Sequence, residues 1–432
     1  MLANRPQIGQ RIYMPKIYAT IGVKLDSAPA RSPPKLCPSN AMETRMVSQP
    51  YLLALALGTA LTLPAFAQEN ADAPEPIAPE TLTVKEAIDP GPNIFSNAQS
   101  WDGASQIQVW SAEDLTYKGN MTAGLMGQML ISPDGTTAYG QSTYMTRITH
   151  GDIEHVLEIY DVATLSITSE IALPAKAAMV AAYTPYLAMS ADGKLVYVQN
   201  ATPATSVTVV DVEAGEVIQE VPTPGCFGIY PTLQGYGFST ACDDGTFASF
   251  ALGAGGTEAT RSVSEVVFDP DENPIFIPGK RIGEALAFIT YNGDLITLDD
   301  SGESVALLDT VSITDDVENA WAPGGYDLFA YSPTADILFV TMHSEPYDGS
   351  HKNASEEIWA YDVSEDTVLY RTHVEGVISL SATDEEAPTL YAVNEHEATL
   401  EIFSSDPEAK YVLKHEASTD SRGWATLVSV AP

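Results

Sequence analysis

The chain has 432 residues, and its 58 acidic side chains far outnumber its 20 basic ones. The resulting formal charge of −38 at pH 7 disfavours nucleic acid and anionic membrane surfaces as partners. Two explanations of this acidity stay open, namely a solvated surface suited to a saline exterior and steering of a cationic substrate or a basic partner. The first is simpler, because salt screens steering beyond about 8 to 10 Å.

Residues 1–67 have the features of an export signal. The run from Tyr51 to Ala67 is apolar, follows the basic Arg45 and ends in Ala-Phe-Ala, which is typical of a signal peptide. A membrane anchor is the alternative, but Pro64 interrupts the run, which is also shorter than the roughly 20 residues of a membrane span. The sequence therefore predicts cleavage after Ala67 and a periplasmic protein.

The first 41 residues are basic and have no periodic pattern, so we expect translation to begin at Met42 or Met46. Loss of residues 1–67 removes seven of the 20 basic and two of the 58 acidic residues, which leaves a formal charge of −43. Residues 68–99 are rich in proline, alanine and acids, and we interpret their first part as a flexible arm.

From about residue 100 to residue 432, short apolar or alternating runs are bounded by Asp-Gly, Asn-Gly, proline and serine turns. No convincing amphipathic helix interrupts them, so this region is predicted to be all-β. One unit recurs seven times, as a strand that ends in a large apolar residue before a turn. The seven end residues, 40 to 63 positions apart, are Trp110, Tyr160, Val210, Phe250, Leu298, Tyr361 and Phe403.

This spacing predicts a seven-bladed β-propeller of four-stranded blades. A solenoid is the competing fold, but ring closure is favoured because it removes exposed sheet edges. A second repeat supports the blades, since polar turns separate strand pairs in the runs that begin at Ile131, Met189 and Tyr331. The irregular steps predict loop insertions around 310–330 and 343–357.

Two polar clusters could suggest chemistry. His343 and His351, with Glu345 and Asp348 between them, could suggest a metal site, but their spacing matches no recognised zinc arrangement. We favour a role in holding a long loop or contacting a neighbouring subunit. The second cluster could suggest acid/base catalysis, but a solvated polar hairpin is favoured there. Its members are Arg147, His150, Asp152, Glu154 and His155.

The remaining motif search favours no catalytic site in this chain. The acidic runs 269–272 and 384–386 are most simply exposed turns, since neither has a full calcium-loop pattern. No nucleophile elbow, His-Glu-x-x-His motif or phosphate-cradling loop follows residue 67. Signal cleavage would remove Cys37 and leave Cys226 and Cys242, an even pair that predicts a disulfide in an exported protein.

Five separated blocks, in consistent order from about residue 100 onward, resemble the heavy chain of aromatic amine dehydrogenase. They resemble the heavy chain of methylamine dehydrogenase more loosely. The blocks are STYMTRITHGDIEHVLEIYDVATLSI, VQNATPATSVTVVDVEAGEVI, GCFGIYP with the later CDDG, DENPIFIP, and the stretch from WAPGGYDLF through MHSEPYDGSHKNASEEIWAYD.

The resemblance implies a heterotetramer of two heavy propellers and two light chains. It places the tryptophan tryptophylquinone cofactor and the catalytic base on the light chain, and neither cofactor nor catalytic residue on this one. Primary amines would be oxidised to aldehydes with release of ammonia, and electrons would pass to a blue-copper protein of the amicyanin or azurin type.

The resemblance also implies roles for individual residues. Cys226 and Cys242 match the heavy-chain disulfide pair of the family. An aromatic residue that lines the channel to the quinone in the family aligns with Leu125 here, so we expect Leu125 on the substrate channel and leave the amine preference open. Two other classes remain as alternatives, a self-sufficient propeller enzyme such as a lactonase and a scaffold without an enzyme partner.

Overall fold

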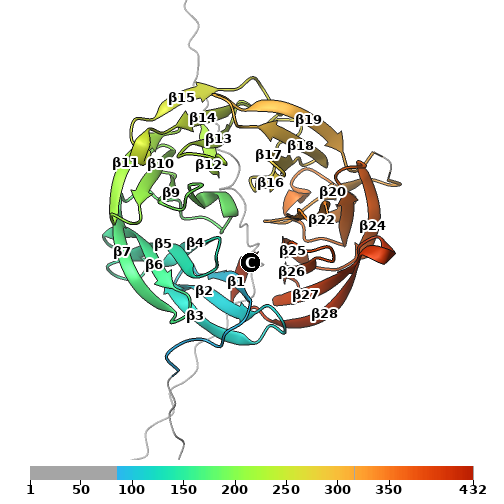
Figure 1. Cartoon of the computed structure of the whole chain (residues 1–432), viewed down its shortest axis with the longest axis horizontal. Helices are drawn as coiled ribbons and strands as arrows, with labels where there is room; N and C mark the ends of the chain where they lie inside the picture. Colours follow the sequence, from blue (N-terminus) through green and yellow to red (C-terminus); the bar gives the residue numbers. More distant parts are fainter. Residues whose placement is uncertain (1–84, 316, 432) are drawn as a thin grey trace, which may run out of the picture. The chain divides into compact units, whose positions relative to one another are not determined.

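The computed structural model describes residues 85–431 except residue 316 (Figure 1). The predicted signal peptide, both candidate start codons and most of the arm lie outside the described residues. Within that part of the chain the regular structure is almost entirely strand, and no helix is long and apolar enough to cross a membrane. The helices are single 3-10 turns: η2 (Thr184–Tyr186), η3 (Ala254–Gly256), η4 (Ser350–Lys352) and η5 (Pro407–Ala409).

Seven antiparallel sheets form a closed ring, which confirms the predicted seven-bladed propeller (Figure 1). From the axis outward, blade 1 contains β29 (Trp424–Val430), β1 (Asn93–Gln99), β2 (Ser105–Ser111) and β3 (Tyr117–Ala123). Blade 2 contains β4 (Leu125–Ile131), β5 (Thr137–Met145), β6 (Ile153–Asp161) and β7 (Ser166–Leu173). Blade 3 contains β8 (Leu187–Met189), β9 (Leu195–Asn200), β10 (Ser206–Asp211) and β11 (Glu216–Pro222), and blade 4 contains β12 (Cys226–Pro231), β13 (Phe238–Cys242), β14 (Phe247–Ala251) and β15 (Thr260–Val263).

Blade 5 contains β16 (Lys280–Ile282), β17 (Ala285–Ile289), β18 (Asp294–Asp299) and β19 (Ala306–Ser312). Blade 6 contains β20 (Trp321–Pro323) with β21 (Phe329–Ser332), then β22 (Ile337–Ser344), β23 (Glu357–Asp362) and β24 (Thr367–His373). Blade 7 contains β25 (Val377–Ala382), β26 (Thr389–Asn394), β27 (Thr399–Asp406) and β28 (Val412–Asp420). In blade 6 the innermost position is shared by two short strands, β20 and β21, which both pair with β22.

Blade 1 closes the ring, because β29 from the end of the chain pairs with β1, with Gln99 opposite Trp424. The propeller therefore begins at Asn93, seven residues before the boundary expected at residue 100. The reason is that β1 (NIFSNAQ) buries polar side chains, so its strand pattern is not apolar enough to recognise. Ser96 and Asn97 are both fully buried and hydrogen-bonded.

Apolar side chains pack between neighbouring blades. One such cluster joins Phe95 and Val109 of blade 1 to Met129 and Tyr160 of blade 2. The seven residues that mark the repeat each lie on the third strand of a different blade, and all are at most 4% exposed. The repeat detected in the sequence is thus the core position of each blade.

The propeller has two ends of different character. Short turns connect β4 to β5 and β8 to β9, and we call this end the turn end. In the first turn Asp134 accepts hydrogen bonds from the Ser132 hydroxyl at 2.6 Å and the Thr136 amide at 3.1 Å. The other end holds the start of β4 and the longer connections, including the predicted insertion at 345–356. We call it the Leu125 end.

Candidate functional site

Leu125 opens β4, the innermost strand of blade 2, close to the axis of the ring. Its side chain is 6% exposed, and its backbone pairs with Thr143. Between Leu125 and Gln128 the strand has one residue more than its partner, which is a β-bulge, and Met126 adopts a positive φ of 47°. The expected channel residue therefore lies at the axial end of a blade, in a locally strained segment.

The connection from β7 to β8, residues 174–186, lies beside this bulge. We call it the axial loop, since its short turn η2 lies near the centre of the ring (green in Figure 1). The Val180 carbonyl accepts hydrogen bonds from Gln99 Nε2 at 3.2 Å and Gln128 Nε2 at 2.9 Å. The Ala182 amide donates to Gln99 Oε1, and Thr426 Oγ1 donates to the Ala182 carbonyl. Side chains from blades 1 and 2 thus fix the axial loop next to Leu125.

Aromatic side chains gather where the axial loop meets blades 4 and 6. Tyr183 lies against Tyr186 and Tyr326, with ring centroids 5.4 and 5.6 Å apart, and Tyr186 packs edge-on against Phe227 at 5.0 Å. Burial raises the pKa of the Tyr183 hydroxyl well above its ordinary value. These rings form an aromatic cluster at the Leu125 end, in which Tyr186 is buried.

A buried ion pair holds the same region together. Lys280 Nζ of blade 5 lies 2.9 Å from Asp327 Oδ1, which is part of the segment between β20 and β21 of blade 6. The Asp327 side chain is only 2% exposed, and its second oxygen accepts a hydrogen bond from the hydroxyl of Thr184 in the axial loop. Blades 5 and 6 and the axial loop are therefore joined through one carboxylate.

The two histidines of the predicted insertion, His343 and His351, make separate contacts. His343 is buried, and its Nδ1 lies 3.0 Å from the Ser344 carbonyl. His351 stacks on Tyr291 with ring centroids 4.4 Å apart, and burial lowers its pKa to about 4. No group of three His, Cys, Asp or Glu side chains within residues 85–431 could hold a metal ion. The contacts fit the favoured role, which is to hold the long loop.

The predicted polar hairpin between β5 and β6 is present. Arg147, His150, Asp152 and Glu154 are exposed. His155 is the exception, because it is buried and lies 3.2 Å from Thr143 Oγ1, and its pKa is lowered by that burial. The cluster does not converge on one point, so the solvated interpretation is confirmed for its four exposed members.

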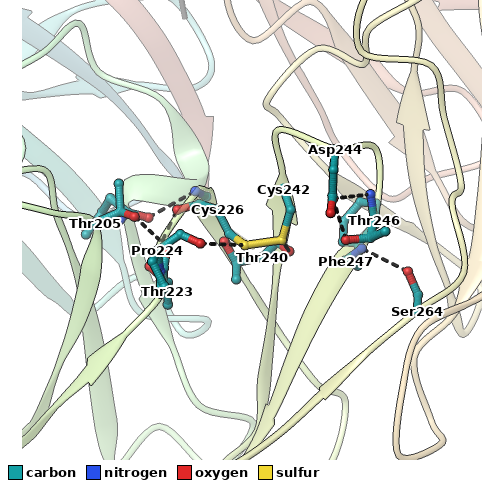
Figure 2. Close-up of a disulfide and its surroundings, with 12 residues drawn as sticks. Thr205, Thr223, Pro224, Cys226, Thr240, Cys242, Asp244, Thr246, Phe247 and Ser264 are labelled. Atoms are coloured by element: carbon teal, nitrogen blue, oxygen red, sulfur yellow. Dashed lines mark hydrogen bonds between the residues drawn. A yellow bond between two sulfur atoms is a disulfide. The ribbon is translucent and has the colours of Figure 1, made fainter. Parts of the chain in front are cut away.

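The predicted disulfide is present between Cys226 of β12 and Cys242 of β13, with an S–S distance of 2.04 Å (Figure 2). Beside it lies an open depression of about 500 Å³ lined by Asp243, Asp244 and residues 266–271, which include the start of the acidic run. Asp269 accepts hydrogen bonds from the amides of residues 271 and 272, as expected for an exposed turn. The run 384–386 is exposed as well.

Sequence reasoning missed the axial loop, the Lys280–Asp327 pair and the amide side chains beside Leu125. One signal was available, because Gln128 lies in a strand whose other residues are apolar or small. A buried amide needs specific partners, so a glutamine inside such a strand indicates a polar contact in the interior. Its partner in the axial loop could not be predicted.

These features define a seven-bladed propeller in which a connecting loop and its aromatic contacts lie near the axis at one end. The methylamine dehydrogenase heavy chain family model matches residues 100–424. The chain belongs to this family, which confirms the resemblance to an amine dehydrogenase heavy chain at family level.

Curated relatives agree with the family match. The chain is 24% identical over 312 residues to the methylamine dehydrogenase heavy chain of Methylorubrum extorquens, covering 70% of this chain and 74% of the relative. It is 25% identical over 292 residues to that of Paracoccus versutus, covering 66% and 68%. Identity at this level agrees with the family match and leaves the amine open.

Solved structures support the fold alone. The periplasmic gluconolactonase of Pseudomonas aeruginosa superposes with a TM-score of 0.52 at 15% identity, over 79% of this chain and 99% of that one. A protein from Bacteroides fragilis described as a 6-phosphogluconolactonase gives 0.57 at 13% identity, over 80% and 100%. Propellers of other activities thus share this architecture.

Proposed function

We propose that this chain is the heavy subunit of a periplasmic primary-amine dehydrogenase. Two heavy chains would assemble with two small light chains, and each light chain would contain tryptophan tryptophylquinone. The observation that carries this proposal is the family match over residues 100–424, which spans all seven blades. The predicted export signal supports the periplasmic location.

The proposed reaction converts a primary ammonium ion and water into an aldehyde and an ammonium ion. Two electrons and two protons leave, and the electrons pass one at a time to a blue-copper protein of the amicyanin or azurin type. When bound in the light chain, the quinone supplies the electron sink, which is chemistry that protein side chains do not provide. This chain would supply no catalytic group, and its part would be to bind, orient and exclude water.

The Leu125 end is the better candidate for light-chain docking. Among the described residues, large apolar side chains are exposed on several connections of the Leu125 end. The connections of the turn end have Leu233, and the outer strands β7 and β19 near that end have Ile167, Leu307 and Leu308. Trp101 is 58% exposed and Ile148 is 68% exposed, and both lie on the same end of blades 1 and 2 as Leu125. Exposed apolar side chains gathered on one end favour a protein partner.

Leu125 would form part of the wall of the amine's route to the quinone. Its place at the axial end of β4 supports this role, since the docked light chain would cover that end. The packed rings around Tyr183 would keep water out beneath the light chain. An aliphatic wall discriminates amines by shape, without the stacking that an aromatic residue offers.

The isolated mature chain tests this proposal. We expect a folded protein that has no quinone absorbance and does not oxidise any primary amine with an artificial electron acceptor. Co-expression with a small exported light chain encoded nearby should produce amine oxidation. Turnover by the heavy chain alone would favour a self-sufficient enzyme such as a lactonase-like propeller, and the absence of any light-chain reading frame nearby would favour a scaffold.

A further inference from the structure

The strand segment that contains Leu125 is held mainly by side chains of the neighbouring blade. The Met126 amide donates to the Ser100 carbonyl at 3.0 Å, outside the ladder that β4 forms with β5. Met126 has a positive φ, which is uncommon for a residue with a side chain. Such a conformation persists only where the surroundings determine it. The contacts around the bulge therefore fix the backbone on either side of Leu125.

Two contacts hold the residue before Leu125. The Gly124 amide donates to the hydroxyl of Ser142 at 2.9 Å, and the Gly124 carbonyl accepts from the Ser105 amide at 3.2 Å. A Cβ at Gly124 would lie 2.5 Å from the Thr143 carbonyl oxygen, so the close approach of the two strands requires glycine. The backbone enters Leu125 along a fixed path.

Three side chains of blade 1 hold the residues after Leu125. The Gly127 carbonyl accepts hydrogen bonds from Asn97 Nδ2 at 2.8 Å and Gln99 Nε2 at 2.9 Å. The Gly127 amide donates to the hydroxyl of Ser105 at 3.2 Å. Asn97, Gln99 and Ser105 thus satisfy both backbone groups of Gly127, and we call these three side chains the bulge clamp.

The side-chain amides of Asn97 and Gln128 donate hydrogen bonds through their nitrogens. Asn97 Oδ1 and Gln128 Oε1 are buried and have no hydrogen-bond partner among the described residues. Burying an acceptor without a donor costs free energy, so an apolar residue would be expected at Asn97 if packing alone mattered. Sequences break such local rules mostly at functional or strained sites. The clamp therefore has a role beyond filling the space between blades.

We infer that Asn97, Gln99 and Ser105 are positioning residues for amine specificity. By fixing the bulge they fix the direction of the Leu125 side chain, and this sets how the assembled enzyme discriminates bulky from small primary amines. The inference rests on the proposed function, because its premise is that Leu125 lies on the amine's route.

The test compares Asn97→Leu and Ser105→Ala in the assembled heavy and light chain complex. Each variant removes one contact to Gly127, and the ratio of kcat/KM for benzylamine to that for methylamine should shift by about threefold or more. Thr240→Val is the matched control. Like Asn97, Thr240 is fully buried and has one side-chain oxygen without a hydrogen-bond partner among the described residues, but it lies in blade 4. It should leave the ratio unchanged.

Hydrogen exchange gives a second readout that does not depend on catalysis. Asn97→Leu should accelerate exchange of backbone amides in residues 124–130, and Thr240→Val should not. An unchanged ratio in both clamp variants, while Leu125→Phe shifts it, would overturn the positioning role and leave the channel intact. An unchanged ratio in Leu125→Phe as well would contradict the channel and the positioning role together. If Asn97→Leu does not fold, Ser105→Ala decides the matter.

Discussion

Two regions of the propeller, the β4–β5 and β8–β9 turns at the turn end and the axial loop at the Leu125 end, are stabilised over very different distances along the chain. At the turn end, Asp134 and Asp192 accept hydrogen bonds from residues within two positions of themselves. At the Leu125 end, Thr426 reaches Ala182 across 244 positions and Thr184 reaches Asp327 across 143. These two turns are held mostly by local contacts, although Asp192 also accepts a hydrogen bond from Tyr236, 44 positions away, whereas the axial loop depends on the closed ring.

This difference has an electrostatic side. At the turn end, the hydrogen bond from the Ser132 hydroxyl is the largest cause that lowers the pKa of Asp134, an exposed carboxylate that water also solvates. At the Leu125 end, Asp327 is removed from water, and its charge is balanced by Lys280. Loss of a partner should therefore matter far more for Asp327 than for Asp134.

The largest effect is expected for Asp327→Leu. Removing the carboxylate leaves the Lys280 ammonium without its partner and releases Thr184 of the axial loop from blade 6, so the free energy of unfolding should fall by about 3 kcal/mol or more. Denaturant unfolding measures this. Asp134→Ala at the turn end should cost clearly less, and adding Lys280→Met to Asp327→Leu should restore part of the loss. Equal losses at the two ends would contradict the comparison.

The disulfide should have a similar but slightly smaller effect. Cys226 and Cys242 are 16 positions apart, and a bridge over a loop of that size stabilises by about 3 kcal/mol in the loop-entropy model. The double variant Cys226→Ala/Cys242→Ala should unfold at correspondingly lower denaturant concentration. Mass spectrometry of unreduced peptides checks the bridge itself, and two free thiols in periplasmic protein would refute it.

Leu125→Phe should change specificity by about tenfold, since altering a pocket wall by a few carbon atoms is worth roughly 1 to 3 kcal/mol. The measurement is the ratio of kcat/KM for benzylic and short alkyl amines in the assembled complex, taken together with the melting temperature. A lower melting temperature with an unchanged ratio would mean that Leu125 only packs between the blades.

The smallest effect concerns acid stability. Burial is the main cause that lowers the pKa of His351 to about 4, from its ordinary value of 6.5. The unfolded chain takes up this proton more readily, so the stability contribution is complete above about pH 6.5 and is lost as the pH falls toward 4. His351→Phe keeps a ring against Tyr291. Between about pH 7 and about pH 4.5, its melting temperature should fall by less than that of the parent protein. Parallel pH profiles for this variant and the parent would show that His351 does not contribute.

The local contacts explain how much of the fold the sequence could predict. Tyr160 and its six counterparts recur because each blade needs a large apolar residue on its third strand, and this period predicted the number of blades. The Asp134 turn was predictable for the same reason, because serine, aspartate and glycine encode a turn within a few residues. The start of β1 was not, since its buried Asn97 makes the strand look polar in sequence.

The candidate site was predictable only in part. Leu125 was identified by resemblance, but nothing near it in the sequence indicates that Asn97 and Gln99 hold the bulge that follows it. Lys280 and Asp327 are 47 positions apart and lie in different blades, so their pairing exists only once the ring has formed. Contacts of this kind follow from topology, and local sequence patterns do not encode them.

The most direct test of the account is the affinity of the light chain for variants at the two ends. Ile148→Asp places a charge on the exposed tip of the β5–β6 hairpin at the Leu125 end, and Leu233→Asp does the same in the β12–β13 turn at the turn end. Since both side chains are exposed, neither change should affect folding. The account predicts that Ile148→Asp weakens light-chain binding by about tenfold or more while Leu233→Asp leaves it unchanged. Weakened binding by Leu233→Asp alone would contradict it.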